Sequence, residues 1–437
     1  MRARWIAMAS LCFLALSAHA RATSLVVATV DNAQMRQMQR LTPVFEKAHP
    51  GITVRWVTLS EGALRRDVTS DIQTQGQQFD VLTIGMYEAP LWARRGWLRP
   101  IRPDVDYDEA DLLAPVREGL SYRGMLYAAP FYGESSILMY RKDLLRRAGR
   151  TMPAQPTWSQ IARLAVRLND PAHGVHGICL RGKPGWGENV ALISTMVNAF
   201  GGQWFDLNWQ PQLLSKPWTQ AVGLYVDLLR KYGPPDAVDR NFNGNLALFE
   251  QGHCAMWVDA SVGAGFVSDP KHSKVAGEVG FSPAPVEVTT KGSHWLWAWG
   301  LAIPADISAA QAAAAQAFID WATSRGYVQL VAQRFGWELA PSGTRESTYA
   351  NPRFEAAAPW APVELRAIQS ADPGDATLPA SPYTGVQFVE IPEFRSIGDT
   401  VGRQVALAVR GRISVAQALA AAQSAAQREM LLGGYPR

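Results

Sequence analysis

The chain has 437 residues, of which 48% are hydrophobic, 18% charged and 10% aromatic, so it is neither disordered nor a fibrous repeat and can build a sizeable core. This length fits about two or three compact units. With 42 Lys and Arg against 38 Asp and Glu, the nearly neutral charge gives no reason to expect nucleic acid or an anionic membrane surface as a partner.

The first twenty residues are typical of a secretory signal peptide. A positive start at Arg2 and Arg4 precedes an apolar run over 5–16, and small residues follow at the spacing that signal peptidase requires. Cleavage after Ala20 or after Ala22 fits equally well, so we expect residues 1–20, or 1–22, to be removed. The apolar run is too short to span a bilayer, and we therefore predict an exported, soluble mature chain.

Strands alternate with helices in the N-terminal part of the mature chain. The hydrophobic pattern predicts, in chain order, a strand over 25–30, a helix over 35–48, a strand over 52–57, a helix over 64–72 and a strand over 79–84. Pro43 lies inside the first helix and is expected to mark a kink or a second helix start at Thr42. This alternation is typical of a mostly parallel α/β sheet, whose ligands bind beyond the carboxyl ends of the strands.

The remainder of the chain repeats this alternation with different residues. The pattern predicts a helix over 157–168, a strand over 177–180, a glycine-rich turn over 181–187, a helix over 218–232, a strand over 254–258 and alanine-rich helices that begin at Ser308 and Ser414. Because no Pro/Ser-rich or charged linker separates the two α/β units, we expect two lobes that share several chain crossings. Cys179 and Cys254 remain after processing, and the sequence leaves open whether they form a disulfide or stay as buried thiols.

Local signatures of enzymes and metal sites are missing from the sequence. It contains no Gly-x-Ser-x-Gly elbow, phosphate-binding loop, His-Glu-x-x-His or Cys-x-x-Cys motif, and its seven histidines are scattered. We therefore predict no catalytic residue, no cofactor and no metal ion.

Aromatic residues instead lie beside carboxylates at the predicted strand ends. The four clusters are Tyr87-Glu88, residues 131–134, Trp257-Val258-Asp259 and residues 295–299. Aromatic rings pack against the C–H faces of a polyhydroxylated ligand, while carboxylates accept hydrogen bonds from its hydroxyl groups. Such charged hydrogen bonds contribute about 1.5–3 kcal/mol each, so two or three dominate a micromolar affinity of about 8 kcal/mol. The clusters therefore indicate a site for a sugar or a sugar alcohol.

Each cluster also has a purely structural interpretation. The three tryptophans of 295–299 share one strand face and could pack in the core, and Glu134 and Asp259 could be ordinary salt-bridge partners. Trp186 is hard to explain as a core residue in a glycine-rich turn, and we interpret it as a lid over a ligand. We interpret Arg345 as a solvated loop residue.

With these residues identified, the chain resembles the extracellular solute-binding components of ABC importers that are built like the maltose-binding protein, and within them the branch that binds sorbitol and mannitol. The resemblance covers essentially the whole mature chain in consistent order. It rests on the segments FDVLTIG (79–85), YEAP (87–90), PFYGESS (130–136), CLRGKPGWGEN (179–189), MWVDA (256–260), WLWAW (295–299) and PYTGVQF (382–388).

This resemblance implies a two-lobed α/β fold of the type II periplasmic binding proteins, with the ligand enclosed between the lobes. It places residues 25–131 and 283–335 in the first lobe and residues 132–282 and 336–437 in the second. The ligand-binding residues that it implies are Asn32, Glu61, Tyr87, Glu88, Tyr132, Glu134, Arg181, Trp186, Trp257, Asp259 and Trp297. Asp31 stands where similar proteins are expected to have asparagine.

The functional hypothesis is a periplasmic receptor that binds sorbitol, mannitol or a related polyol and delivers it to the transmembrane subunits of an ABC permease. We expect this receptor to be monomeric. Binding by one lobe and closure of the other by a hinge motion would precede docking on the permease. The alternative is a secreted glycan-active enzyme, because two carboxylates among aromatic rings also describe a glycosidase cleft.

Overall fold

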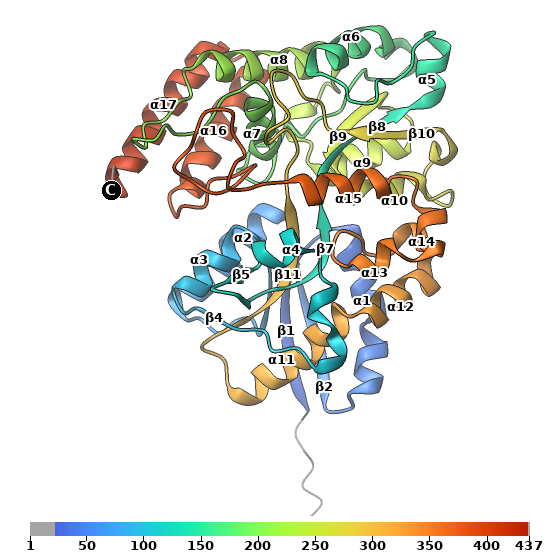
Figure 1. Cartoon of the computed structure of the whole chain (residues 1–437), viewed down its shortest axis with the longest axis vertical. Coiled ribbons are helices and arrows are strands. Elements are labelled where there is room, and N and C mark those ends of the chain that lie inside the picture. The colour runs from blue at the N-terminus through green and yellow to red at the C-terminus, as the bar shows by residue number, and fades with distance from the viewer. Residues whose placement is uncertain (1–21, 436–437) are drawn as a thin grey trace, which may run out of the picture.

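The computed structural model describes residues 22–435. The predicted signal peptide, residues 1–20 or 1–22, therefore lies outside the described residues, except for Ala22 in the longer version. Two sheets organise the described chain (Figure 1). The larger sheet has the strand order β2-β1-β3-β11-β4, with β7 also paired to β11. Its strands are β1 (Thr23–Val30), β2 (Ile52–Leu59), β3 (Val81–Gly85), β4 (Leu98–Arg99), β7 (Ala129–Glu134) and β11 (Trp297–Pro304).

Strands β1, β2 and β3 pair in parallel, as the alternating pattern predicts, whereas β11 runs antiparallel to β3, β4 and β7. The helices around this sheet are α1 (Ala33–Ala48), α2 (Glu61–Thr74), α3 (Glu88–Arg94), α4 (Ala114–Gly119), α11 (Ala309–Ala322) and α12 (Arg325–Phe335). Helix α1 is a single element with Pro43 inside it, so the expectation of a second start at Thr42 is wrong. We call this part of the molecule the first lobe.

The smaller sheet has the order β10-β8-β9 and is antiparallel throughout. Its strands are β8 (Ser136–Arg141), β9 (Met256–Ala260) and β10 (Val279–Pro283). Around it lie α5 (Lys142–Arg147), α6 (Trp158–Leu168), α7 (Asn189–Ala199), α8 (Lys216–Tyr232), α9 (Phe242–Glu250), α10 (Gly263–Ser268), α15 (Ala361–Ser370), α16 (Phe394–Val409) and α17 (Val415–Leu432). This part is the second lobe.

Four further short strands and helices lie in the described chain. The two-residue strands β5 (Ser121–Tyr122) and β6 (Met125–Leu126) form a hairpin, and α13 (Glu346–Tyr349) and α14 (Pro352–Ala357) link α12 to α15. Among the described residues, the structure contains no helix that is both long and apolar enough to cross a membrane.

The chain passes between the lobes where the two sheets meet. Strand β7 of the larger sheet ends at Glu134, and β8 of the smaller sheet begins at Ser136. A second crossing joins β10, which ends at Pro283, to β11, which begins at Trp297. In Figure 1, β7 and β11 run side by side at this junction, where they also pair. The strand ends at this junction therefore lie between the two lobes.

Candidate functional site

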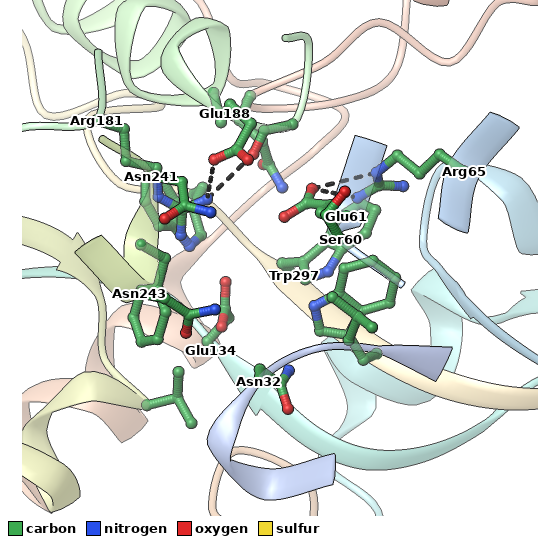
Figure 2. A pocket seen from close by; sticks show the side chains of 18 of the residues that line it. Asn32, Ser60, Glu61, Arg65, Glu134, Arg181, Glu188, Asn241, Asn243 and Trp297 are labelled. Atoms are coloured by element: carbon green, nitrogen blue, oxygen red, sulfur yellow. Dashed lines mark hydrogen bonds and ion pairs between the residues drawn. The ribbon is translucent and has the colours of Figure 1, made fainter. Parts of the chain in front are cut away.

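A cavity of about 150 Å³ lies between the lobes. That is about ten times the 10–15 Å³ needed by one water molecule, so a ligand of about a dozen non-hydrogen atoms fits. Residues from β1, α2, β7, β11, α7, α9 and the glycine-rich turn contribute side chains to it, and Figure 2 shows most of them. The lining residues are Val30, Asp31, Asn32, Ser60, Glu61, Arg65, Tyr132, Glu134, Arg181, Trp186, Gly187, Glu188, Ala191, Asn241, Phe242, Asn243, Val262, Trp295, Trp297, Trp299 and Gln387.

The aromatic floor of the cavity follows from strand geometry. Side chains two residues apart in a strand point to the same face, and β7 pairs with β11 so that Tyr132 stands opposite Trp299 and Glu134 opposite Trp297. These four side chains consequently form one patch that faces the cavity. Trp295 lies just before β11 and also lines the cavity. All three tryptophans of 295–299 thus reach the cavity while remaining almost fully buried.

Gly85 at the end of β3 explains how the Trp297 indole reaches its position. A Cβ atom at residue 85 would lie 1.9 Å from the indole ring, so any other residue would displace the tryptophan. Gly187 in the same way leaves room for a first-lobe side chain to come close to the second lobe. Its hypothetical Cβ would lie 2.4 Å from Oε1 of Glu61, which belongs to the first lobe.

Two polar residues of the first lobe are positioned by the starts of helices. Asn32 is the N-cap of α1, where its Oδ1 accepts a hydrogen bond from the Met35 amide at 2.9 Å, and its Nδ2 donates to the Tyr132 hydroxyl at 2.9 Å. Glu61 begins α2 and accepts hydrogen bonds from the guanidinium of Arg65, one helical turn later. Both side chains therefore have local roles as well as a place in the cavity wall.

Arg65 connects the first lobe to the second. Its Nη1 bonds Glu88 at 2.5 Å, and its guanidinium lies 4.1 Å from the ring centroid of Trp186, which belongs to the second lobe. The rings of Trp297 and Trp299 lie 5.0 and 4.8 Å from the same guanidinium. The cation thus lies among three tryptophans, an arrangement that favours the closed cavity.

Arg181 is held within the second lobe. Its Nε and Nη2 donate to the carboxylate of Asp259, with Nη2 to Oδ1 at 2.7 Å, and its Nη1 donates to the Gly187 carbonyl. The indole Nε1 of Trp257 donates to the other carboxylate oxygen of Asp259 at 3.0 Å. Asp259 is fully buried and directs the Arg181 guanidinium toward the cavity.

A disulfide fixes the segment that carries Arg181. Cys179 and Cys254 are bonded, with Cα atoms 5.9 Å apart, which settles the alternative that the sequence left open. The backbone of Cys179 also forms an isolated parallel β-bridge with Trp257 of β9. The covalent link therefore joins the residues just before the glycine-rich turn to those just before β9, the strand that supplies Asp259.

Burial governs the ionisation of the carboxyl groups in the cavity. Glu134 is 6% exposed, and burial raises its pKa to about 8, with further raising by Asp259 and Glu61 and an opposing effect of Arg181. Burial and the charge of Glu61 raise the pKa of Glu188, against the lowering effects of Arg181 and Lys183. The described residues contain no cluster of three or more His, Cys, Asp or Glu side chains able to hold a metal ion.

The cavity brings together seven of the residues that the sequence implied: Asn32, Glu61, Tyr132, Glu134, Arg181, Trp186 and Trp297. Four others lie outside its lining. Glu88 and Asp259 stand behind the two arginines, and Trp257 stands behind Asp259. The Tyr87 hydroxyl donates to the Ile391 carbonyl at 2.9 Å, a contact between segments far apart in sequence.

Some lining residues escaped the sequence reasoning. Arg65 follows Glu61 by four residues, a spacing that could have revealed it. Glu188 follows the glycine-rich turn and precedes α7, but nothing in the local pattern distinguishes it from a surface residue. Asn243, near the start of α9, donates across the lobes to the Asp31 carbonyl at 2.8 Å, which no sequence signal shows. Arg345, which we expected to be solvated, is instead fully buried and paired with Asp111 away from the cavity.

Two lobes around a cavity of rings and carboxyl groups define the class of protein. The family of bacterial extracellular solute-binding proteins matches residues 29–329, and the chain belongs to this family. Its members bind solutes for transport, so the enzyme alternative is wrong.

Individual relatives refine this assignment. The chain is 54% identical over 417 residues to a mannitol-binding protein of Pseudomonas aeruginosa, and the match covers 95% of each chain. An ABC transporter solute-binding protein of Agrobacterium vitis, solved with bound D-mannitol, is 52% identical with a TM-score of 0.93, and the match covers 95% of this chain and all of that one. A ribitol complex from Agrobacterium radiobacter is 27% identical with a TM-score of 0.82, over 93% of this chain and 98% of that one. A maltose-bound protein of T. maritima, 21% identical with a TM-score of 0.79 over 94% of this chain, shares the fold.

Proposed function

We propose that the protein is the receptor of an ABC importer and binds a sugar alcohol, mannitol or a close relative, in the cavity between its lobes. The observation that carries this proposal is the cavity itself, whose size suits a six-carbon polyol and whose wall combines tryptophan rings with buried carboxyl and guanidinium groups. The two relatives above 50% identity, one named for mannitol and one solved with it, support the same ligand class.

The proposed division of roles follows the geometry. Asn32, Glu61, Tyr132, Glu134 and Arg181 line the cavity and would exchange hydrogen bonds with ligand hydroxyls. Trp186 and Trp297 would pack against the carbon chain. Tyr87, Glu88, Trp257 and Asp259 would act indirectly, by fixing the arginines or the contact between the lobes.

Closure would trap the ligand because its contacts come from both lobes. Only a ligand that binds the closed form more strongly can shift the equilibrium toward that form. We propose that the lobes comprise residues 25–131 with 283–335 and residues 132–282 with 336–437, so that two of the boundaries fall within β7 and at the end of β10, where the chain crosses between the sheets. The closed monomer would then dock on the permease, in the periplasm, after export by the signal peptide of residues 1–20 or 1–22.

Titration of the mature protein with a ligand panel tests this proposal. Mannitol, sorbitol, arabitol, xylitol, ribitol and free hexoses would each be followed by calorimetry and by tryptophan fluorescence, since Trp186, Trp295, Trp297 and Trp299 line the cavity. We expect one hexitol to bind with a dissociation constant of about 1 μM, which corresponds to about 8 kcal/mol. Tight binding of a hexose without binding of any alditol would contradict the proposal.

A further inference from the structure

Acidic groups outnumber cations around the cavity. Glu61, Glu134 and Glu188 line it together with Asp31, which is paired with Arg36, and Glu88 and Asp259 lie directly behind its arginines. The cations that face these carboxyl groups are Arg65, Arg181 and Lys183, whose Nζ lies 3.8 Å from Oε1 of Glu188. Lys183 is also partly exposed to solvent. The charged groups that act on Glu134 are Arg181, Asp259, Glu61 and Glu364, and those that act on Glu188 are Glu61, Arg181, Lys183 and Asp259.

Two of the lining carboxyl groups lack hydrogen bonds. Oε2 of Glu188 is buried without a hydrogen-bond partner among the described residues, and its nearest cation, Nη1 of Arg181, is 3.9 Å away. The Glu134 carboxyl also makes no hydrogen bond or ion pair within the described part of the chain, and its oxygens are not fully buried but open to the cavity. Figure 2 shows the two side chains pointing into the same space, Glu188 from above and Glu134 from below.

Both carboxyl groups face the cavity and receive no hydrogen bond from the described residues, so this arrangement favours a ligand that donates hydrogen bonds to both. A hydroxyl group donates one proton and carries no charge, whereas an ammonium group donates three and is positive. Hydrogen bonds between an ammonium and a carboxylate are also about twice as strong as neutral ones.

We propose that the cavity also binds polyols that carry one primary ammonium group, the aminodeoxyalditols, with the ammonium facing Glu134 and Glu188. This inference rests on the proposed function, because it assumes that the polyol chain occupies the same cavity. It extends the ligand class from neutral sugar alcohols to cationic ones and excludes sugar acids, whose carboxylate would face the same two groups.

Proton linkage gives this inference a distinctive signature. Burial holds the pKa of Glu134 at about 8, so this group is largely protonated at neutral pH before an ammonium arrives, and burial raises the pKa of Glu188 as well. An ammonium ligand favours the ionised form and releases a proton as it binds. As the pH increases toward about 8, the affinity for the ammonium ligand therefore rises by up to about tenfold per pH unit. Above about pH 8 the affinity levels off.

Calorimetry of the mature full chain with three probes of equal stereochemistry tests the inference: D-mannitol, 1-amino-1-deoxy-D-mannitol and D-mannonate. Between about pH 6.5 and about pH 7.5, the affinity of the amino compound relative to mannitol should rise at least about fivefold. Binding enthalpies in buffers of different ionisation enthalpy should show a released proton, and mannonate should bind at least about a hundredfold more weakly than mannitol.

A ratio that does not change with pH, or mannonate binding as tight as that of the amino compound, would overturn the inference. Mannitol binding without binding of the amino compound would overturn the inference alone, whereas failure of both would also overturn the proposed function.

The variants Glu188→Gln and Glu134→Gln assign the effect to these two groups. Each removes one charge at nearly constant shape and should lower the preference for the amino compound at about pH 7.5 by about fivefold to tenfold relative to mannitol. If one variant does not fold, the other gives the same readout. Glu355→Gln, at an exposed position of α14, is the matched control and should leave the preference unchanged. An unchanged preference in both cavity variants would overturn the assignment.

Discussion

The two lobes each bring one buried arginine to the cavity, but they hold it in different ways. Arg181 of the second lobe is fixed by a bidentate bond to Asp259 of the same lobe. Arg181 also follows the disulfide-bonded Cys179 by two residues. Arg65 of the first lobe is bonded to Glu61 and Glu88 and stacks on Trp186 of the opposite lobe.

The difference separates a preformed wall from one that closure completes. Among the described residues, the hydrogen-bond partners of the Arg181 guanidinium all lie in its own lobe, so these bonds can form without the first lobe. The stacking of Arg65 on Trp186 exists only when the lobes are together. Changes behind Arg181 should therefore affect stability first, and changes around Arg65 should affect ligand affinity first.

Removal of Asp259 should have the largest effect on stability. In Asp259→Ala, the Arg181 charge stays buried without its partner, and loss of one member of a buried ion pair costs about 3–5 kcal/mol. Urea unfolding of the unliganded protein measures this loss. Asp227→Ala removes the partner of Lys231 in an exposed pair and should change the unfolding free energy by less than about 1 kcal/mol. Equal losses of unfolding free energy in the two variants would contradict the view that the wall around Arg181 is preformed.

Removal of the disulfide should be the next largest effect. The double variant Cys179→Ala/Cys254→Ala frees a link between residues separated by 75 positions, and such a link stabilises a fold by about 2–4 kcal/mol. Thermal unfolding with and without a reductant measures the effect, and the reductant should destabilise the parent protein alone. Because Asp259 still orients Arg181, mannitol affinity should change by less than about threefold, or about 0.65 kcal/mol. A loss of affinity without a loss of stability would show that the disulfide serves the site and not the fold.

Substitution of Arg65 probes the wall that closure completes. Arg65→Lys keeps the positive charge but loses the planar group that stacks on Trp186 and the fork that reaches both Glu61 and Glu88. We expect mannitol affinity to fall about tenfold, which is about 1.4 kcal/mol. Arg40→Lys is the matched control, since Arg40 stacks on Phe335 on the outside of the first lobe. If both variants bind mannitol like the parent, the stacking between the lobes does not stabilise closure.

Much of this architecture could be predicted from the sequence. The periodic pattern located β1, β2 and β3 to within three residues at each end, and the capping boxes at Thr157 and Ser414 begin helices α6 and α17 as expected. The aromatic clusters at strand ends led to the tryptophans of β11, because alternation in a strand fixes which side chains share a face.

Which residues face the cavity and which lie behind them could not be predicted in the same way. Whether a carboxylate meets a ligand or stands behind an arginine depends on tertiary contacts between distant segments, as for Asp259 with Arg181. Glu88 and Glu134 look alike in sequence, each beside a tyrosine or glycine at a strand end, yet one is bonded to Arg65 and the other faces the cavity. Pattern and spacing carry no information on this distinction.

The pH dependence of stability separates these two glutamates further. The folded-state pKa of Glu134 is about 8, above its usual value of 4.5, so its contribution to stability is fully present below about pH 4.5 and is lost as the pH rises through about 8. The parent protein without ligand should therefore melt at a lower temperature at about pH 8 than at about pH 5, and Glu134→Gln should lessen this difference. Each kcal/mol gained in unfolding free energy raises the melting temperature by about 2–4 °C in a domain of 150–250 residues. An exposed control, Glu355→Gln, should keep the parent's pH profile, and an unchanged profile in Glu134→Gln would mean that Glu134 is ionised in the unliganded cavity. Because closure buries this carboxyl between the lobes, the same measurement reports how much of the cavity is already formed before a ligand binds.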